Sequence, residues 1–140
     1  MDVTMREMFI EDYENVIKLW KHADGIGLSE ADSRENISVF LARNPGLSVV
    51  AEIDGAIIGA VLCGHDGRRG YLHHLAVSEE KRLKGIGKGL VERCFDNLKQ
   101  FGITRCHIFV FRRNQTARDF WLKMGWQQRD DLDIMSKGAQ

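Results

Sequence analysis

Three alternating glycines and four basic residues stand near the middle of the chain, directly after an apolar run. The run is Leu75-Ala76-Val77, and residues 78–89 follow it as SEEKRLKGIGKG. Backbone N–H groups at the start of a helix have no intrahelical acceptor and lie at the positive end of the helix dipole, so they can hold phosphate oxygens. Glycines leave room for such a ligand beside the backbone. The stretch therefore predicts a strand, a phosphate-binding loop and a helix.

Two common glycine-rich phosphate sites do not fit this stretch. A dinucleotide fingerprint requires glycine where Leu90 stands, and a P-loop requires serine or threonine where Gly89 stands. A solvated basic turn with flexible glycines is the alternative without a ligand. The elements around the stretch are needed to decide between a phosphate site and such a turn.

Hydrophobic periodicity and turn signals divide the rest of the chain into strands and helices. Asp54-Gly55 predicts one hairpin turn and residues 65–70 a second, so three middle strands form an antiparallel meander. Ser29-x-x-Asp32 resembles a capping signal before the second helix. The predicted strands cover residues 5–10, 47–53, 56–63, 71–77, 105–111 and 127–135, and the predicted helices cover residues 11–22, 30–43, the segment from the glycine loop to about 101, and 114–124.

This order, β-α-α-β-β-β-α-β-α-β, predicts an α/β (α+β) fold. Helices cross over after the fourth and fifth strands, which makes neighbouring strands parallel there and places helices on both faces of the sheet. Neither a repeat nor a linker divides the sequence, so residues 1–140 are predicted to form a single domain.

Two motifs in this order resemble those of the GCN5-related N-acetyltransferase (GNAT) family. The pattern Arg82-x-x-Gly85-x-Gly87 after an apolar strand is similar to the family's coenzyme A pyrophosphate loop. The family's later motif, an asparagine, a small residue, an aromatic pair and a glycine-aromatic ending, resembles Asn114-x-x-Ala117-x-x-Phe120-Trp121-x-x-Met124-Gly125-Trp126. The resemblance covers nearly the whole chain. It implies the GNAT fold, with a mixed, mostly antiparallel central sheet of six or seven strands and helices on both faces.

The resemblance also implies where a cofactor would lie. In the family, acetyl-coenzyme A (acetyl-CoA) occupies a V-shaped opening between the fourth and fifth strands. Main-chain groups of the fourth strand pair with its pantetheine arm, and loop amides hold its pyrophosphate. Asn114 would face the cofactor, although a plain helix cap also explains it. The residues to which cofactor binding is carried over are Leu75, Ala76, Val77, Arg82, Leu83, Lys84, Gly85, Ile86, Gly87, Lys88, Asn114 and Trp121. No metal site is expected.

Acetyl transfer to an amine requires a base, because a protonated alkyl amine has a pKa near ~10, and histidine has a suitable ordinary pKa. Strict strand alternation places Tyr71 and His73 on one face and His74 and Ala76 on the other, unless a bulge shifts it. The run is similar to the strand of arylalkylamine N-acetyltransferases, in which histidines at the places of His73 and Tyr71 line the proton route. His73, acting through water, and Tyr71 are the predicted catalytic residues, and hydrogen-bonded sheet residues are the alternative.

Trp121 departs from the family pattern. Many members have a tyrosine at this place, whose hydroxyl is thought to protonate the departing thiolate, and an indole N–H is far too weak an acid for that work. A thiol has a pKa near ~8.5, so water could return the proton. Packing in the apolar stripe of its helix explains Trp121 without a catalytic role.

The resemblance implies an acetyl-CoA-dependent N-acetyltransferase that acts on a primary amine. Transfer is expected to be direct, since no acyl-carrying nucleophile is evident. A small-molecule amine is the first candidate acceptor. The alternatives are a protein N-terminus or lysine, as in ribosomal-protein acetyltransferases of this fold, and a coenzyme A-binding module without turnover. In the family the acceptor is selected largely by the first two helices and their loop, where Asp24, Glu30 and Asp32 could attract a cationic amine or simply be solvated.

Composition excludes several other classes. The 140 residues carry 20 basic and 20 acidic side chains, and zero net charge argues against nucleic acid or an acidic membrane as the main partner. No segment approaches the ~18–20 apolar residues of a membrane span, so a cytoplasmic protein is expected. Cys63, Cys94 and Cys106 are odd in number and lie in apolar elements, so buried reduced thiols are expected. Dimers are common among relatives of this fold, and a homodimer stays open.

Overall fold

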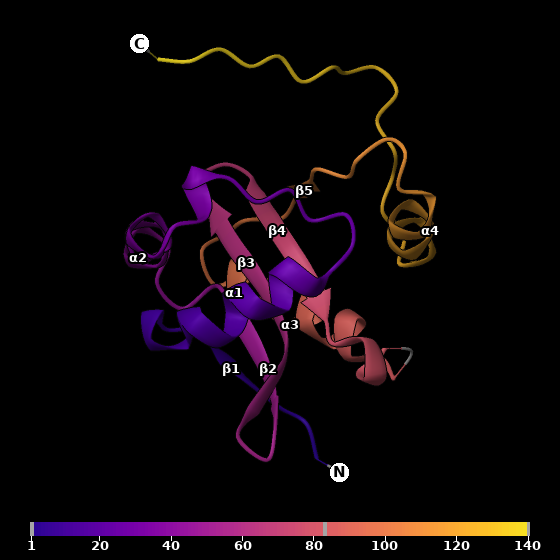
Figure 1. The fold of residues 1–140 in the computed structure, drawn as a ribbon. Coiled ribbons are helices and arrows are strands. Elements are labelled where there is room, and N and C mark those ends of the chain that lie inside the picture. The colour runs from indigo at the N-terminus through magenta and orange to yellow at the C-terminus, as the bar shows by residue number, and fades with distance from the viewer. Residues whose placement is uncertain (1, 83, 140) are drawn as a thin grey trace. The chain divides into compact units, whose positions relative to one another are not determined.

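The computed structural model of the chain describes residues 2–82 and 84–139 (Figure 1). They form two compact units, unit 1 (Met1–Phe109) and unit 2 (Val110–Gln140). Unit 1 contains the sheet and the first three helices, and unit 2 contains the fourth helix. Leu83, a predicted cofactor contact, lies outside the described residues.

One sheet in unit 1 has the spatial order β1-β2-β3-β4-β5. Neighbours from β1 to β4 are antiparallel, and β5 is parallel to β4, as a crossover through a helix requires. The prediction of a mixed, mostly antiparallel sheet is therefore confirmed. The strands are β1 (Thr4–Glu7), β2 (Val49–Ile53), β3 (Ala56–His65), β4 (Gly70–Val77) and β5 (Cys106–Ile108).

The prediction of six or seven strands is wrong, since the described residues form a five-stranded sheet. Residues 127–135, predicted as the last strand, pair with no strand, and β5 is shorter than predicted. Leu132 and Ile134 alternate with aspartates as in a strand, but they are 59% and 68% exposed. Alternation shows which side chains a strand would bury, but it does not supply a neighbouring strand to pair with.

Serine side chains cap the second helix of unit 1 and the 3-10 turn before it. Ser29 Oγ accepts a hydrogen bond from the Ala31 N–H at 3.2 Å, which confirms the predicted capping signal. Ser33 then adopts an extended backbone and accepts from the Asn36 N–H at 3.1 Å, so a second cap follows the first. The predicted helix over residues 30–43 is thus one 3-10 turn and a separate helix. The elements are α1 (Tyr13–His22), preceded by η1 (Ile10–Asp12); α2 (Arg34–Arg43), preceded by η2 (Glu30–Asp32); and α3 (Ile86–Lys99), preceded by η3 (Glu79–Lys81).

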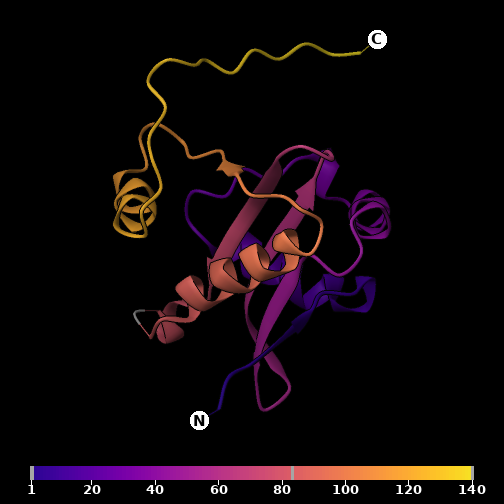
Figure 2. The same cartoon turned by 180° about the vertical axis from the view of Figure 1, so that it is seen from behind.

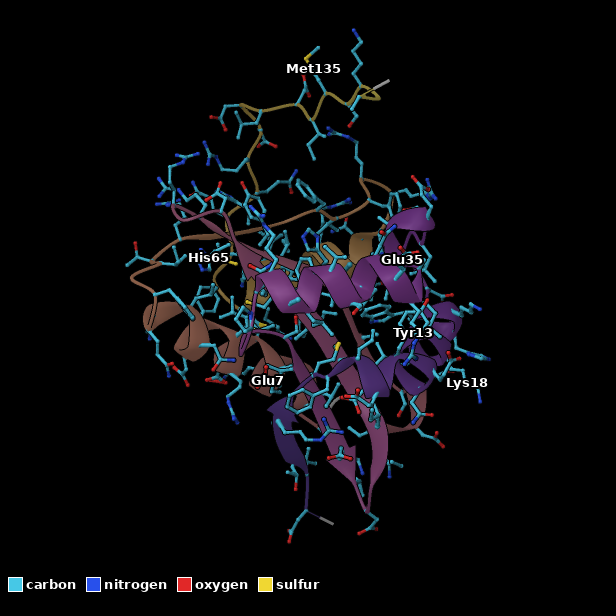
Figure 3. All side chains as sticks on the ribbon, turned by 90° about the vertical axis from the view of Figure 1, so that its left-hand side faces the viewer. Glu7, Tyr13, Lys18, Glu35, His65 and Met135 are labelled. Carbon is cyan, nitrogen blue, oxygen red and sulfur yellow. The ribbon has the colours of Figure 1, made fainter. Side chains whose placement is uncertain are left out.

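Helices cover both faces of the sheet in unit 1. α1 and α2 lie on one face and α3 lies on the other, as the opposite views of Figures 1 and 2 show. Figure 3 shows the side chains of α1 and α2, with Tyr13 and Glu35 labelled. Trp20 of α1 and Ile37 of α2 pack on this face against sheet residues that include Val50, Ala60, Leu62 and Ala76.

α3 packs unusually close to the sheet because glycines lie at the contacts. A Cβ atom at Gly70 would lie 2.8 Å from Leu98 Cδ1, and one at Gly89 would lie 2.7 Å from Met5 Cε of β1. Both distances are shorter than carbon atoms tolerate. Gly89 therefore serves the packing of α3 on β1, a role that the sequence did not indicate.

An ion-pair cluster ties β1 to β2 and to the start of α1. Arg6 Nε lies 2.7 Å from Glu52 Oε1, and Arg6 Nη2 lies 2.8 Å from Asp12 Oδ1. Asp12 Oδ2 also accepts a hydrogen bond from the Phe9 N–H at 2.8 Å. The hydrogen bonds from Arg6 are the main reason why the pKa of Asp12 is lowered.

Unit 2 contains α4 (Gln115–Lys123) and the second motif. Asn114 Oδ1 accepts a hydrogen bond from the Ala117 N–H at 3.0 Å, so Asn114 is the helix cap that the sequence allowed. Trp121 is buried, with its ring T-shaped against Phe120 at 5.2 Å and Trp126 at 4.9 Å. In the part of the chain that the structure describes, no helix is long and apolar enough to cross a membrane.

Candidate active site

β4 and β5 pair at one end only. Their paired positions are Gly70↔Cys106, Tyr71↔His107 and Leu72↔Ile108. Among the described residues, β4 has no paired strand on this side from His73 to Val77. This stretch of β4 is therefore a free edge among the described residues, and we call the side that it faces the opening.

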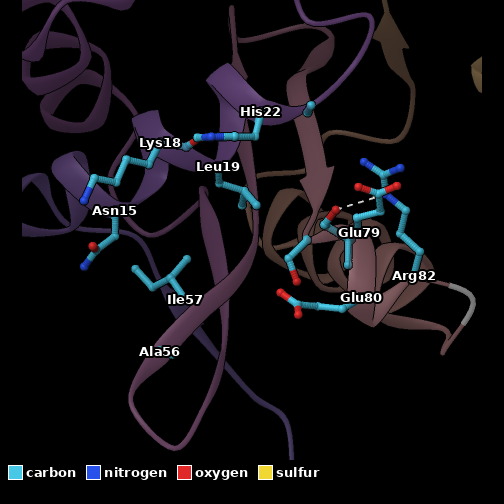
Figure 4. Close-up of a pocket in the computed structure, with 12 residues that line it drawn as sticks. Asn15, Lys18, Leu19, His22, Ala56, Ile57, Glu79, Glu80 and Arg82 are labelled. Atoms are coloured by element: carbon cyan, nitrogen blue, oxygen red, sulfur yellow. Dashed lines mark hydrogen bonds between the residues drawn. The ribbon is translucent and has the colours of Figure 1, made fainter.

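Main-chain groups of β4 point into this opening. The Ser78 N–H donates to the Ile58 carbonyl of β3 at 2.8 Å. Because backbone groups alternate along an antiparallel strand, those of Ala76 also face β3, whereas those of Leu75 and Val77 face the opening. The Val77 carbonyl accepts a hydrogen bond from Arg82 Nε at 3.2 Å, the contact dashed in Figure 4.

A β-bulge interrupts β4 at the level of the opening. Ala60 of β3 pairs with Ala76 and Leu62 pairs with His73, so three steps along β4 match two along β3. His74 has φ 56°, a left-handed conformation that is uncommon for a residue with a Cβ atom. The bulge that the sequence left open is therefore present, and strict alternation fails beyond His73 because the extra residue shifts the side chains that follow it.

The bulge brings His74 and Ala76 to the same face as His73, the face that α1 and α2 cover. The ring of His73 lies 6.2 Å from that of Phe40 in α2, and the ring of His74 lies 5.0 Å from that of Trp20 in α1. Ala76 belongs to the same core cluster as Trp20. Two consecutive histidines thus share one face, which no alternating strand permits.

His73 lies in an aromatic surrounding next to the opening. Its ring stacks with Tyr71 at 6.5 Å and lies 6.1 Å from Phe109 and 6.4 Å from His74. Burial lowers the pKa of His73, the neighbouring His74 lowers it further, and the Asp32 carboxylate opposes both. His73 is therefore neutral near pH 7 and has a nitrogen lone pair that can accept a proton.

His74 makes a contact that the sequence did not reveal. Its Nε2 lies 2.9 Å from Asp32 Oδ1 of η2, and the two side chains are only 19% and 9% exposed. Asp32 Oδ2 accepts from the Ser29 N–H at 3.0 Å, and the Asp32 carbonyl accepts from the Tyr13 hydroxyl at 2.7 Å. Nothing in the local pattern around Asp32 points to a histidine 42 residues away.

The phosphate-binding loop predicted from the glycines ends in an open helix start. Gly85, with φ 75°, is the residue before α3, and the Gly89 N–H donates to its carbonyl at 3.0 Å as the first bond of the helix. No side chain caps this start and no acidic residue lies in its first turn. The N–H groups of residues 86–88 therefore have no intrahelical acceptor and are available to an anion.

Basic side chains accompany this helix start. Arg82, Lys84 and Lys88 are exposed, whereas the side chain of Ile86 is buried, so Ile86 can offer only its backbone. A pocket of about 460 Å³ adjoins the loop on the side of α1, where Val77 and Arg82 form part of its wall (Figure 4). Its lining residues are Asn15, Lys18, Leu19, His22, Ala23, Ala56, Ile57, Val77, Ser78, Glu79, Glu80 and Arg82.

Two predicted cofactor contacts belong to unit 2, and the cysteines are the remaining candidates for chemistry. Asn114 and Trp121 belong to unit 2, and their contacts with a cofactor stay predictions. Cys63 and Cys94 are buried free thiols, as expected, and Cys106 is partly buried. Over residues 2–82 and 84–139, no group of three or more histidine, cysteine or acidic side chains could hold a metal ion.

Comparisons with known proteins identify the family of this chain. Residues 4–126 match the acetyltransferase (GNAT) family. An acetyltransferase of Yersinia enterocolitica is 32% identical over 121 residues, which cover 86% of this chain and 85% of that protein.

Solved structures resemble the chain over most of its length. The PaiA N-acetyltransferase from Thermoplasma acidophilum, in complex with coenzyme A, has a TM-score of 0.81 at 25% identity and covers 93% of this chain and 92% of its own. The diaminobutyrate acetyltransferase EctA from Paenibacillus lautus, in complex with its substrate and coenzyme A, has a TM-score of 0.71 at 19% identity and matches in fold over 88% of this chain and 74% of its own. Because the family match spans residues 4–126, the chain belongs to the acetyltransferase (GNAT) family, is an N-acetyltransferase and takes its acetyl group from acetyl-CoA.

Proposed function

We propose that this chain acetylates the primary amine of a small molecule, with His73 as the base. The observation that carries the proposal is the free edge of β4, which leads from the open start of α3 to a bulge bearing His73 and His74. The edge and the helix start suit one extended phosphorylated ligand. The histidines lie where its far end would meet an acceptor.

The residues along this edge fit acetyl-CoA. The backbone groups of Leu75 and Val77 would pair with the pantetheine arm, and the N–H groups of residues 86–88 would hold the pyrophosphate. Arg82 would leave the Val77 carbonyl, which it now occupies, and turn its charge to the phosphates together with Lys84 and Lys88. Bound acetyl-CoA supplies a thioester carbonyl for the amine to attack and a thiol that can leave.

His73 is suited to take the proton of the acceptor amine, through a water molecule. An amine with a pKa near ~10 is mostly protonated at pH 7, so it must lose a proton before it can attack. His73 is neutral because burial lowers its pKa. Tyr71 stacks on His73 and would continue the route toward solvent.

Direct transfer is supported by the state of the cysteines. A cysteine takes up an acyl group by attacking as its thiolate, and the product is a thioester. Burial raises the pKa of the Cys106 thiol to about 12, and Cys63 and Cys94 are 0% exposed. The acetyl group would therefore pass from donor to amine without an acyl-enzyme.

The acceptor side offers fewer charges than the sequence suggested. Asp32 was a candidate to attract a cationic amine, but His74 and the Ser29 N–H already occupy its carboxylate. Asp24 and Glu30 remain exposed on the same segment. A small amine that meets the rings of Tyr71 and His73 suits this side better than a strongly cationic peptide.

Calorimetric titration with acetyl-CoA, followed by a thiol-release screen of amines and peptides, tests the proposal. Binding with release for small amines is the expected result. Release only with peptide N-termini or lysine peptides would replace the acceptor by a protein. Binding of acetyl-CoA without thiol release for any acceptor would indicate a coenzyme A-binding module. Trp121 is the reason to consider this outcome, because it stands where many family members have a tyrosine.

A further inference from the structure

We propose that Asp32 is a positioning residue of this acetyltransferase. Asp32 holds the ring of His74 and thereby fixes the bulge of β4 against residues 29–32, which lie on the acceptor side. The inference rests on the proposed function, because it gives Asp32 a part in the same acceptor side. Asp32 itself touches neither substrate nor cofactor in this assignment.

Asp32 joins three elements through bonds that leave it little freedom. Its two carboxylate oxygens accept from His74 of β4 and from the backbone of Ser29, and its carbonyl accepts from the Tyr13 hydroxyl of α1. The Asp32 side chain is only 9% exposed, so water replaces these partners poorly. Segment 29–32 is therefore fastened to the strand that bears His73.

The contact also fixes the proton on the ring of His74. A carboxylate only accepts hydrogen bonds, so the Nε2 of His74 must carry the hydrogen toward Asp32. In the neutral ring, Nδ1 then holds the lone pair. The edge contact with Trp20, at 5.0 Å and 63°, restricts the ring plane further.

The backbone at His74 explains why such a support is needed. A residue with a Cβ atom at φ 56° is in a conformation that costs free energy and persists only when its surroundings hold it. The bulge sets the direction of His73 as well, because His73 is the last residue paired in register before it. A displaced His74 would therefore move His73, and misplacement of a catalytic group by about 1 Å can cost ~100-fold in rate.

Charge links the same residues. The ionisable groups packed against His74 are Asp32 from η2 and His73 from β4, and Tyr13 of α1 binds the Asp32 carbonyl. The Asp32 carboxylate raises the pKa of His73 while His74 lowers it. Removing Asp32 should therefore lower the pKa of His73, and removing His74 should raise it.

The kinetic test compares D32N, D32A and E35Q. E35Q is the matched control, because Glu35 is an exposed carboxylate of α2 only three residues after Asp32. D32A should lower kcat/KM for the acceptor about 10- to 100-fold, and D32N less, because an amide oxygen can still accept from His74. The affinity for acetyl-CoA should change less than about 2-fold, and E35Q should match wild type within the same ~2-fold.

A pH profile adds a readout that a merely structural role would not move. The acid limb of kcat/KM should shift to lower pH in D32N, which loses a charge that raises the pKa of His73. It should shift to higher pH in H74Q, which removes the neighbouring side chain that lowers the pKa of His73. Equal shifts of the same sign in both variants would overturn the inference.

Nitrogen NMR of the histidine rings tests the pair without turnover. His74 should show hydrogen on Nε2 in wild type and a mixture of ring tautomers in D32A. An unchanged ring in D32A, or D32A kinetics equal to those of E35Q in an active protein, would overturn the inference alone. A loss of acetyl-CoA affinity in D32N parallel to its loss of rate would overturn it too, because that result indicates general damage. If wild type acetylates no amine, the proposed function fails instead, together with the acceptor role of Asp32.

Discussion

Glutamate in place of Gly87 would put a carboxylate where the phosphate loop should be most sensitive to charge. Gly87 lies in the first turn of α3, which has no acidic residue and no side-chain cap. A carboxylate at a helix start stabilises the helix by ~0.3–1 kcal/mol, so G87E should unfold at the wild-type temperature or slightly above it. Stability and cofactor binding are thus expected to change in opposite directions.

The loss of affinity follows from the geometry of the helix start. A carboxylate about 5 Å from a phosphate held by the N–H groups of this turn would repel it by ~3 kcal/mol at an effective dielectric constant of about 20. That energy corresponds to ~100-fold weaker binding for each phosphate charge at that distance. G87Q adds a side chain of similar size without the charge, and it separates repulsion from steric blocking.

Calorimetric titration of both variants with acetyl-CoA, at low and high salt, is the assay. G87E should bind ~100-fold or more weakly than G87Q at low salt, and the gap should narrow as the Debye length falls from ~10 Å at 0.1 M to ~3 Å at 1 M. Equal affinities of G87E and G87Q would refute the assignment of this helix start to the pyrophosphate. An affinity gap accompanied by a lower unfolding temperature of G87E would refute the electrostatic argument.

Three further predictions follow from other parts of the chain. H73A should lower kcat/KM about 10- to 1000-fold with nearly intact acetyl-CoA binding, and wild-type activity should fall on acidification at a pH below the ordinary histidine value of about 6.5, because the pKa of His73 is lowered; the same pH profile in H73A and wild type would exclude His73 as the base. N114A should destabilise α4 by ~1 kcal/mol, measured by hydrogen exchange of the helix, whereas N114D should preserve the cap; equal protection in both variants would argue against the cap. Because the pKa of Asp12 is lowered in the folded state, its stabilising effect is present above about pH 4 and is lost as the pH falls further, so urea unfolding of D12N should depend less on pH between about 4 and 2 than that of wild type; parallel pH curves would contradict this.

Local signals in the sequence were reliable where one short segment decides the structure. The caps at Ser29 and Asn114 and the turn at Asp54-Gly55 lie within a few residues of the groups that they serve, and each is found in the structure. The parallel pairing of β4 and β5 was also predictable, because a helix that connects two neighbouring strands makes them parallel.

Features that depend on distant partners could not be predicted in this way. The bulge at His74 arises where β4 carries one residue more than β3, and a single strand sequence does not show the register of its partner. The pairing of His74 with Asp32 depends on that bulge. Strict alternation therefore placed His74 on the wrong face, and Asp32 was interpreted only as a capping residue and a possible attractor of a cationic amine. Gly89 was grouped with the phosphate loop, although its contact with Met5 explains it.

The buried cysteines give this protein a built-in reporter of how its layers separate. Cys94 lies on α3 and Cys63 on the strand beneath it, both 0% exposed, so a thiol reagent can modify them only when α3 leaves the sheet. The rate of their modification would then measure local opening of the layer that carries the phosphate loop. A ligand that binds the start of α3 should slow this modification in proportion to its occupancy, which gives a measure of cofactor affinity that requires no acceptor.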